Sequence, residues 1–124
     1  MNILNILIVD DIIVNRFILK EMIRKLGHLS MEAENGKQAL ELIQANDFDC
    51  VFMDIEMPVM NGFETIKAIR DTLPTSKKTV KVIALTAYNP KLLFEDFKET
   101  GFDMVFTKPF SIEKLTMILS ENIQ

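Results

Sequence analysis

Residues 3–11 read ILNILIVDD, a short apolar run that ends in two aspartates. Four more short apolar runs follow at 29–33, 50–53, 80–85 and 104–106, each bounded by polar or turn-forming residues. These runs lack the strict alternation of apolar and polar residues that marks a strand with one solvated face. Strands that are covered on both faces have this pattern, and such strands belong to parallel sheets.

The segments between these runs carry apolar residues at helical spacing. Helices are expected at 14–26, 37–45, 63–73, 90–101 and after 111, with Asn35, Asn89 and Ser111 as N-terminal caps. In the first of them Arg16 is expected to lie away from the apolar stripe. The residues expected to face the core are Ile18, Leu19, Met22, Ile23, Leu26, Ala39, Leu40, Ile43, Phe63, Ile66, Ile69, Leu73, Leu93, Phe97, Ile112, Leu115, Leu119 and Ile123.

The strict alternation of strands and helices predicts an α/β fold with helices on both faces of one parallel, doubly wound sheet. The 124 residues suit a single domain, since domains have roughly 100–200 residues. With 48% hydrophobic and 26% charged residues, the composition is that of a folded globular chain and excludes a disordered one. We therefore expect one domain over residues 1–124.

Charge and cysteine content exclude several classes of function. The net charge of −4 has the wrong sign for a nucleic-acid binder, so no direct contact with nucleic acid is expected. The single cysteine, Cys50, excludes an intramolecular disulfide and leaves a cysteine-based zinc site unsupported. The run at 3–9 is too short for a signal peptide or a membrane span. A cytoplasmic protein without membrane contact is the expectation.

Polar residues stand at the expected carboxyl ends of four strands: Asp10 and Asp11, Asp54, Thr86, and Lys108. Doubly wound sheets bind their ligands at this edge. Carboxylates that converge there repel one another unless a cation lies between them. A site of oxygen ligands without His or Cys favours Mg²⁺, and a lysine and a hydroxyl nearby suit a phosphate oxygen.

Four motifs carry a resemblance to a known family: IVDD at 8–11, MDIEMPVMNG at 53–62, ALTA at 84–87 and TKPF at 107–110. Together they resemble the receiver domain of two-component phosphorelay systems, over residues 3–123. The pair Asn15-Arg16, with Leu26-Gly27-His28 after it, is most similar to receivers of hybrid sensor histidine kinases. The resemblance implies a flavodoxin-like sheet with strand order 2-1-3-4-5.

The resemblance further implies that Asp54 takes a phosphoryl group from a phosphohistidine. Mg²⁺, for which Mn²⁺ could substitute, would be held by the carboxylates of Asp11 and Asp54 and by the backbone carbonyl of Glu56. Asp10 would act through a bound water. Such a domain catalyses its own phosphorylation and dephosphorylation and is not a conventional enzyme.

The remaining site residues follow from the same resemblance. Lys108 and Thr86 would bind phosphoryl oxygens, and the peptide before Pro109 would be cis. Thr86 would also carry a two-state conformational shift, whereas Val105 occupies the position of the family's switch aromatic and predicts a muted or different readout. Tyr88, two residues after Thr86, is expected to affect the lifetime of the phosphoryl group.

The expected partners are a histidine kinase or histidine phosphotransfer protein and a downstream protein partner. The match leaves no effector domain within 1–124, so a stand-alone regulator and a segment of a hybrid kinase are both open. One alternative is a pseudo-receiver that works without phosphorylation. Another is a phosphohydrolase of the haloacid-dehalogenase type, which requires a second aspartate two residues after the nucleophile, where this chain has Ile12 or Glu56. A nucleotide-binding domain lacks its glycine-rich motif here.

Overall fold

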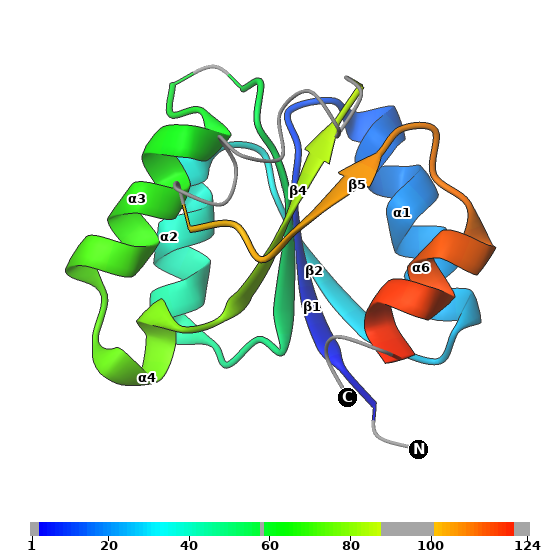
Figure 1. Ribbon diagram of the computed structural model, residues 1–124, viewed down its shortest axis with the longest axis horizontal. Helices are drawn as coiled ribbons and strands as arrows, with labels where there is room; N and C mark the ends of the chain where they lie inside the picture. Colours follow the sequence, from blue (N-terminus) through cyan, green and yellow to red (C-terminus); the bar gives the residue numbers. More distant parts are fainter. Residues whose placement is uncertain (1–2, 58, 88–100, 121–124) are drawn as a thin grey trace.

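The sheet is built from five parallel strands in the order β2-β1-β3-β4-β5, in a computed structural model that describes residues 3–57, 59–87 and 101–120 (Figure 1). The strands are β1 (Asn5–Val9), β2 (Leu29–Ala33), β3 (Cys50–Asp54), β4 (Lys81–Thr86) and β5 (Met104–Thr107). β1 pairs with β2 on one side and with β3 on the other, so the direction in which strands are added to the sheet reverses at β1. The predicted fold class and strand order are confirmed.

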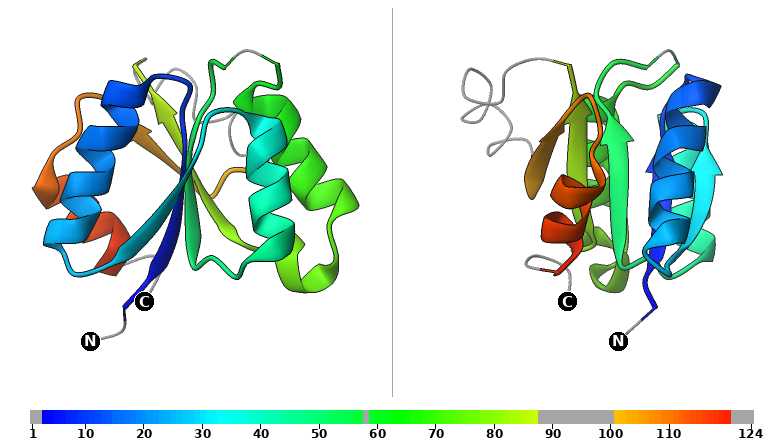
Figure 2. Two further views of the ribbon diagram at one scale, coloured as in Figure 1. Left: turned by 180° about the vertical axis from the view of Figure 1, so that it is seen from behind. Right: turned by 90° about the vertical axis from the view of Figure 1, so that its right-hand side faces the viewer.

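Helices cover both faces of this sheet, as the views in Figures 1 and 2 show. One face carries α1 (Ile13–Lys25) and α6 (Ile112–Ile118), and the other carries α2 (Gly36–Ala45) and α3 (Gly62–Thr72). A single turn, α4 (Thr75–Lys78), follows α3 after Pro74 and was not expected from the sequence. The helix expected at 90–101 lies outside the described residues except at Gly101, as does Ile123.

Two hydrophobic cores, one on each face, explain the apolar runs of β1, β3 and β4. Leu7, Val51 and Ala84 belong to the core beneath α2 and α3. Their neighbours Ile8 and Phe52 belong to the core beneath α1 and α6. Successive side chains of a strand point to opposite faces, so a strand buried on both sides is apolar throughout. The edge strand β2 was wrongly expected to be covered on both faces, since Leu29 is 61% and Met31 41% exposed.

The first helix departs from its expected orientation at two positions. Ile18 is 41% exposed although it was expected to face the core, because Leu19 and Ile23 alone make the fully buried stripe. Arg16, expected to lie away from the core, is only 7% exposed. Burial of its guanidinium is possible because hydrogen bonds to Asp10 and Glu32 satisfy it.

No helix in the described ranges is long and apolar enough to cross a lipid bilayer.

Gly62 begins α3 against the end of β3, where a Cβ atom would lie 2.6 Å from the Cα of Ile55 and 2.7 Å from the carbonyl oxygen of Asp54. Only glycine allows this close approach. The helix is thereby held directly beside the carboxyl end of the central strand.

Candidate functional site

The register of the sheet brings the expected site residues to one edge. Val9 pairs with Met53, so Asp10, which follows β1, lies beside Asp54 at the end of β3. Thr86 ends β4 and pairs with Thr107, the residue before Lys108. The carboxyl ends of four neighbouring strands therefore meet at the point where the strand order reverses, which is where open α/β sheets bind ligands.

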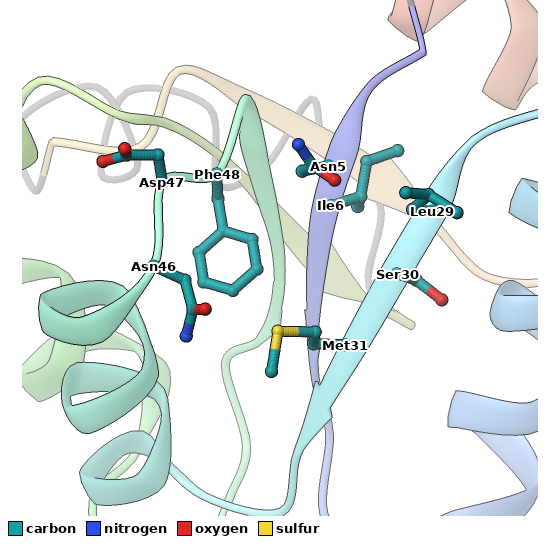
Figure 3. Close-up of a pocket in the computed structure, with 8 residues that line it drawn as sticks. All are labelled: Asn5, Ile6, Leu29, Ser30, Met31, Asn46, Asp47 and Phe48. Atoms are coloured by element: carbon teal, nitrogen blue, oxygen red, sulfur yellow. The ribbon is translucent and has the colours of Figure 1, made fainter.

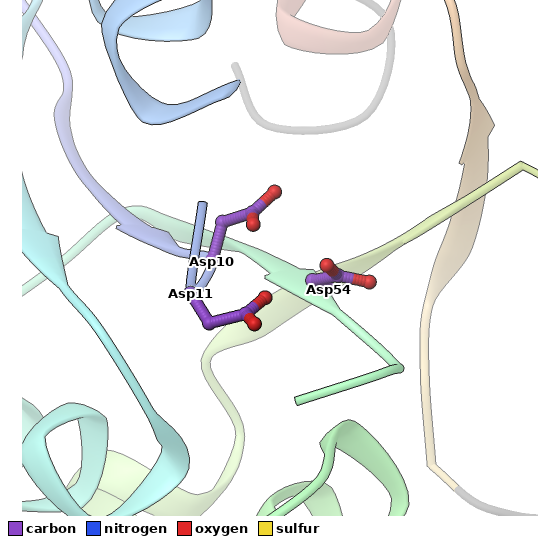
Figure 4. Close-up of side chains that lie close together, drawn as sticks. All are labelled: Asp10, Asp11 and Asp54. Carbon is purple, nitrogen blue, oxygen red and sulfur yellow. The ribbon is translucent and has the colours of Figure 1, made fainter. Parts of the chain in front are cut away.

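Three carboxylates form a compact acidic cluster at this edge (Figure 4). Asp10, Asp11 and Asp54 each offer an oxygen, and these oxygens lie within 4.8 Å of one another. Asp10 is fully buried and Asp54 is 5% exposed, whereas Asp11 is open to solvent. The structure thus confirms that the three aspartates expected at the metal site come together.

The carboxylate of Asp10 has one satisfied and one unsatisfied oxygen. Its Oδ1 accepts a hydrogen bond of 2.9 Å from the backbone N–H of Ile12. Its Oδ2 is, among the described residues, the one buried side-chain oxygen or nitrogen without a hydrogen-bond partner. A buried carboxylate oxygen without a hydrogen bond is costly unless a cation lies near it, and Nζ of Lys108, at 3.6 Å, is near without forming a hydrogen bond. The donor set of carboxylate oxygens and the unsatisfied atom together fit a hard divalent cation.

Lys108 brings an ammonium group close to two of the three carboxylates. Its Nζ lies 3.6 Å from Oδ2 of Asp10 and 3.6 Å from Oδ2 of Asp54. The backbone N–H of Lys108 donates to the carbonyl of Thr86 at 2.8 Å, which fixes the start of the loop after β5. The peptide between Lys108 and Pro109 is cis, as expected.

The surroundings of Asp54 raise its pKa when no metal is bound. Burial is the main cause that raises the pKa of Asp54 to about 6, and the charges of Asp10 and Asp11 act in the same direction. The N–H of Glu56, which donates to Oδ1 at 3.1 Å, and the ammonium of Lys108 oppose them. A cation bound to the cluster would stabilise the ionised carboxylate, which is the nucleophilic form.

Other expected roles are only partly addressed by the geometry. Glu56 lies two residues after Asp54, and its backbone N–H donates a hydrogen bond to Oδ1 of Asp54. The use of the Glu56 carbonyl as a metal ligand stays a prediction. Thr86 is 2% exposed at the end of β4, and its contact with a phosphoryl oxygen is likewise still a prediction. Tyr88 lies outside the described residues.

The position of the expected switch aromatic is occupied by a small side chain. Val105 is half-buried and packs against the core beneath α2 and α3. Phe106 points to the other face, where its ring centroid lies 6.2 Å from that of Phe52 and 5.3 Å from that of Phe110. Phe106 is therefore fixed in the opposite core and does not replace the missing aromatic, as the strand periodicity predicts.

Arg16 is a residue of this site that sequence reasoning missed. Its Nη1 donates to the backbone carbonyl of Asp10 at 2.7 Å, and its Nε donates to Oε1 of Glu32 at 3.2 Å. Long helical side chains point back toward the N-terminus of their helix, so an arginine one turn into α1 reaches the strand end before it. That direction, together with the position of Arg16 six residues after Asp10, was the available signal.

A cavity at the far end of the strands is separate from this site. It has a volume of about 190 Å³ and is lined by residues at the start of β1 and β2 and in the loop after α2 (Figure 3). The lining residues are Asn5, Ile6, Leu29, Ser30, Met31, Asn46, Asp47 and Phe48. None of these residues belongs to the acidic cluster, which lies at the opposite edge of the sheet.

Comparisons with known proteins agree with the geometry. Residues 6–120 match the response regulator receiver domain family. Sporulation initiation phosphotransferase F of Bacillus subtilis is 34% identical over 110 residues, which cover 89% of this chain and 86% of that protein. Hybrid signal transduction histidine kinase A of Dictyostelium discoideum is 35% identical over 117 residues, or 93% of this chain. The chain spans only 5% of the length of that kinase.

Solved structures show the same fold and, in one case, the metal. Chemotaxis protein CheY4 of Vibrio cholerae has a TM-score of 0.86 and 30% identity, with 95% of this chain and 97% of that chain covered. The receiver domain of the sensor histidine kinase PA1611 of Pseudomonas aeruginosa has a TM-score of 0.84 and 30% identity over 95% of each chain. That receiver carries a magnesium ion coordinated in its active site cleft.

The relatives include receiver segments of hybrid histidine kinases as well as stand-alone regulators. The matched family, the parallel sheet and the acidic pocket of Asp10, Asp11 and Asp54 all point to the same conclusion. This chain belongs to the response regulator receiver domain family and is a phosphoacceptor of two-component signalling.

Proposed function

We propose that Oδ2 of Asp54 accepts the phosphoryl group from a phosphohistidine on a histidine kinase or histidine phosphotransfer protein. The observation that carries the proposal is the position of Asp54, which is 5% exposed, belongs to the acidic cluster and has its Oδ2 3.6 Å from Nζ of Lys108. The carboxylate oxygen forms the new P–O bond while the P–N bond to the donor imidazole breaks. The electron pair of that bond remains on the imidazole nitrogen.

Phosphoryl transfer has a loose transition state, so the domain contributes mainly positioning and charge neutralisation. Lys108, whose ammonium faces Asp54, binds one phosphoryl oxygen. The hydroxyl of Thr86 at the neighbouring strand end binds a second, and this contact couples the phosphorylated state to β4. Asp54 itself is the nucleophile.

The cluster of Asp10, Asp11 and Asp54 holds Mg²⁺, and Mn²⁺ can substitute because it prefers the same oxygen ligands. The unsatisfied Oδ2 of Asp10 and the mutual repulsion of the carboxylates support this assignment. When bound, the cation neutralises charge on the transferring phosphoryl group. The carboxylate of Asp54 then stays ionised at neutral pH.

The surface beside the cluster supports a protein as the phosphodonor. The N-terminal half of α1 and the residue before it expose apolar side chains next to Asp11: Ile12, Ile13, Val14, Phe17 and Ile18, each between 41% and 69% exposed. A contiguous apolar patch of this kind marks a protein interface. A partner that covers it would bring its phosphohistidine to Asp54.

We also propose that the protein is located in the cytoplasm, as is typical of receiver domains.

The proposal is tested by incubating the protein with Mg²⁺ and a small acyl phosphate and measuring its intact mass. We expect one added phosphoryl group, which Asp54→Asn abolishes and the exposed α3 control Asp71→Asn leaves in place. No adduct on the wild type would favour the pseudo-receiver. Rapid multiple turnover of phosphate esters would favour the phosphohydrolase.

A further inference from the structure

Asp10 is held on three sides by hydrogen bonds. Its backbone N–H donates to the carbonyl of Ala33 on β2 at 3.2 Å, and its Oδ1 accepts from the N–H of Ile12 at 2.9 Å. Its carbonyl accepts from Nη1 of Arg16 at 2.7 Å. The one acceptor of this buried residue without a hydrogen bond is Oδ2, which belongs to the acidic cluster (Figure 4).

The bond from Arg16 fixes more than a single oxygen. A peptide unit is planar, so the carbonyl of Asp10 and the N–H of Asp11 share one rigid plane. The guanidinium that anchors this carbonyl therefore sets the orientation of the backbone from which both carboxylates project. Arg16 in turn is anchored to the adjacent strand, because its Nε donates to Glu32 on β2.

The charge of Arg16 is partly compensated by two glutamates that do not belong to the acidic cluster. Glu32 binds its Nε at 3.2 Å, and Oε1 of Glu34 lies 4.0 Å from its Nη2. Lys20 approaches Glu32 at 3.5 Å and shares that carboxylate. The side chain of Arg16 is 8% exposed, and within the described residues its hydrogen bond to the site goes to the backbone of Asp10 and not to a carboxylate of the cluster, so its role there is geometric.

We infer that Arg16 is a positioning residue for the divalent cation, acting by fixing the Asp10–Asp11 peptide so that both carboxylates face the metal. The inference rests on the proposed magnesium site. Groups that orient metal ligands from outside the coordination sphere commonly change metal affinity by roughly 10–100-fold when they are removed. Arg16 occupies this position relative to Asp10.

A positioning role and a purely electrostatic role of Arg16 predict opposite changes in metal affinity when the residue is replaced. Removing a positive charge near three carboxylates should strengthen the binding of a dication if electrostatics decides. Removing the hydrogen bond to the carbonyl of Asp10 should weaken it, because the ligands lose their orientation. The sign of the change in affinity of Arg16→Met therefore separates the two explanations.

The experiment measures Mn²⁺ affinity by electron paramagnetic resonance, at a temperature where circular dichroism shows each variant to be folded. We expect Arg16→Met to weaken binding roughly tenfold, as for other residues that orient metal ligands. Arg16→Lys keeps the charge and one donor, so its affinity should lie between those of Arg16→Met and the wild type. Glu32→Gln removes the ion pair but keeps the bond to Asp10, and it should change affinity by about threefold or less.

A second readout needs no metal. The amide nitrogen of Asp11 belongs to the anchored peptide plane, so its NMR resonance should shift in Arg16→Met and much less in Glu32→Gln. Equal or tighter Mn²⁺ binding by folded Arg16→Met overturns the inference. Should that variant not fold, wild-type affinity in Arg16→Lys overturns it instead. If the wild type itself binds no Mn²⁺, the proposed metal site fails and the role of Arg16 falls with it.

Discussion

Each of the three aspartates at the strand ends has a different environment. Asp10 is buried and held in place, Asp11 is exposed, and Asp54 faces Lys108. Sequence reasoning predicted all three because each directly follows or ends an apolar strand. The burial of Arg16 was missed: its position six residues after Asp10 was a local signal, but the bond to Glu32 on β2 that completes its environment forms only in the folded chain.

Replacing Asp54 by asparagine should stabilise the metal-free protein at neutral pH. Burial and the neighbouring carboxylates raise the pKa of Asp54 to about 6, above its value in an unfolded chain. A raised carboxyl pKa gives stability that is full below about pH 4 and is lost as the pH rises through 6. At pH 7 we expect Asp54→Asn to be more stable by roughly 1–3 kcal/mol, since one pKa unit corresponds to about 1.4 kcal/mol.

Urea unfolding of the wild type and Asp54→Asn from pH 4 to pH 8, without metal, measures this difference. The two curves should approach each other below about pH 4, separate between about pH 4 and pH 6, and stay a constant distance apart at higher pH. Mg²⁺ should stabilise the wild type more than the variant, because the variant has lost one ligand. A constant difference across the pH range would show that the ionisation of Asp54 does not set the stability of the site.

Lys108 competes with the metal for the same carboxylates, as its Nζ is 3.6 Å from both Asp10 and Asp54. Lys108→Met should therefore bind Mn²⁺ several-fold more tightly. A partly screened charge pair contributes about 1 kcal/mol, and the variant removes this competing interaction. The same variant should react more slowly with an acyl phosphate, since a phosphoryl oxygen loses its cation. Titration calorimetry and the intact-mass time course measure the two effects, and parallel losses in both would contradict this account.

The lone thiol is expected to be inert in the folded protein. Cys50 is fully buried, and this burial, with the charge of Asp49 as a second cause, raises its thiol pKa to about 12. We expect no reaction with a thiol reagent at pH 8 in buffer and complete reaction in denaturant, because only the unfolded chain exposes a normal thiol. Fast labelling of the native protein would show that β3 opens readily.

At the scale of elements, the starts of α2 and α6 were predicted correctly from their caps. Asn35 accepts from the N–H of Gln38 at 2.9 Å, and Ser111 accepts from the N–H of Lys114 at 3.2 Å, as their caps predict. These signals are local, so the sequence alone contains them. The exposure of Ile18 was not predictable in this way, because it depends on which part of α1 the sheet covers.

Arg70 links α3 to the starts of β4 and β5, a long-range role that no local pattern indicates. It donates hydrogen bonds to the carbonyls of Lys78, Val80 and Gly101 and to Oδ2 of Asp103. Asp103 in turn accepts from the N–H of Val82 at 2.8 Å. One side chain thus holds together the segments that enter two neighbouring strands.

Arg70→Met should destabilise the fold by roughly 2–4 kcal/mol, because it leaves several backbone carbonyls without their donor. The matched control is Arg24→Met, which removes an exposed ion pair with Glu21 and should cost less than about 0.5 kcal/mol. Chemical denaturation of both variants gives the comparison. Equal losses would mean that the Arg70 network contributes no more than a surface pair.

At the scale of the whole molecule, the alternation of apolar runs and helical segments was enough to predict the parallel sheet. The strand order came from the resemblance to receiver domains, since periodicity does not say which strands are neighbours. The order matters for function, because β1 between β2 and β3 is what brings Asp10 beside Asp54. The site is thus a product of the topology, and its residues lie far apart in the sequence.

Phosphorylation of Asp54 is tested most directly by identifying which residue carries the phosphoryl group. Borohydride reduces an aspartyl phosphate to homoserine, so peptide mass spectrometry after treatment with an acyl phosphate, Mg²⁺ and borohydride identifies the modified residue. We expect homoserine at position 54 alone, dependent on Mg²⁺, with Asp10 and Asp11 unchanged. Conversion of Asp10 or Asp11, or no conversion in a protein that is folded and metal-bound, would contradict it.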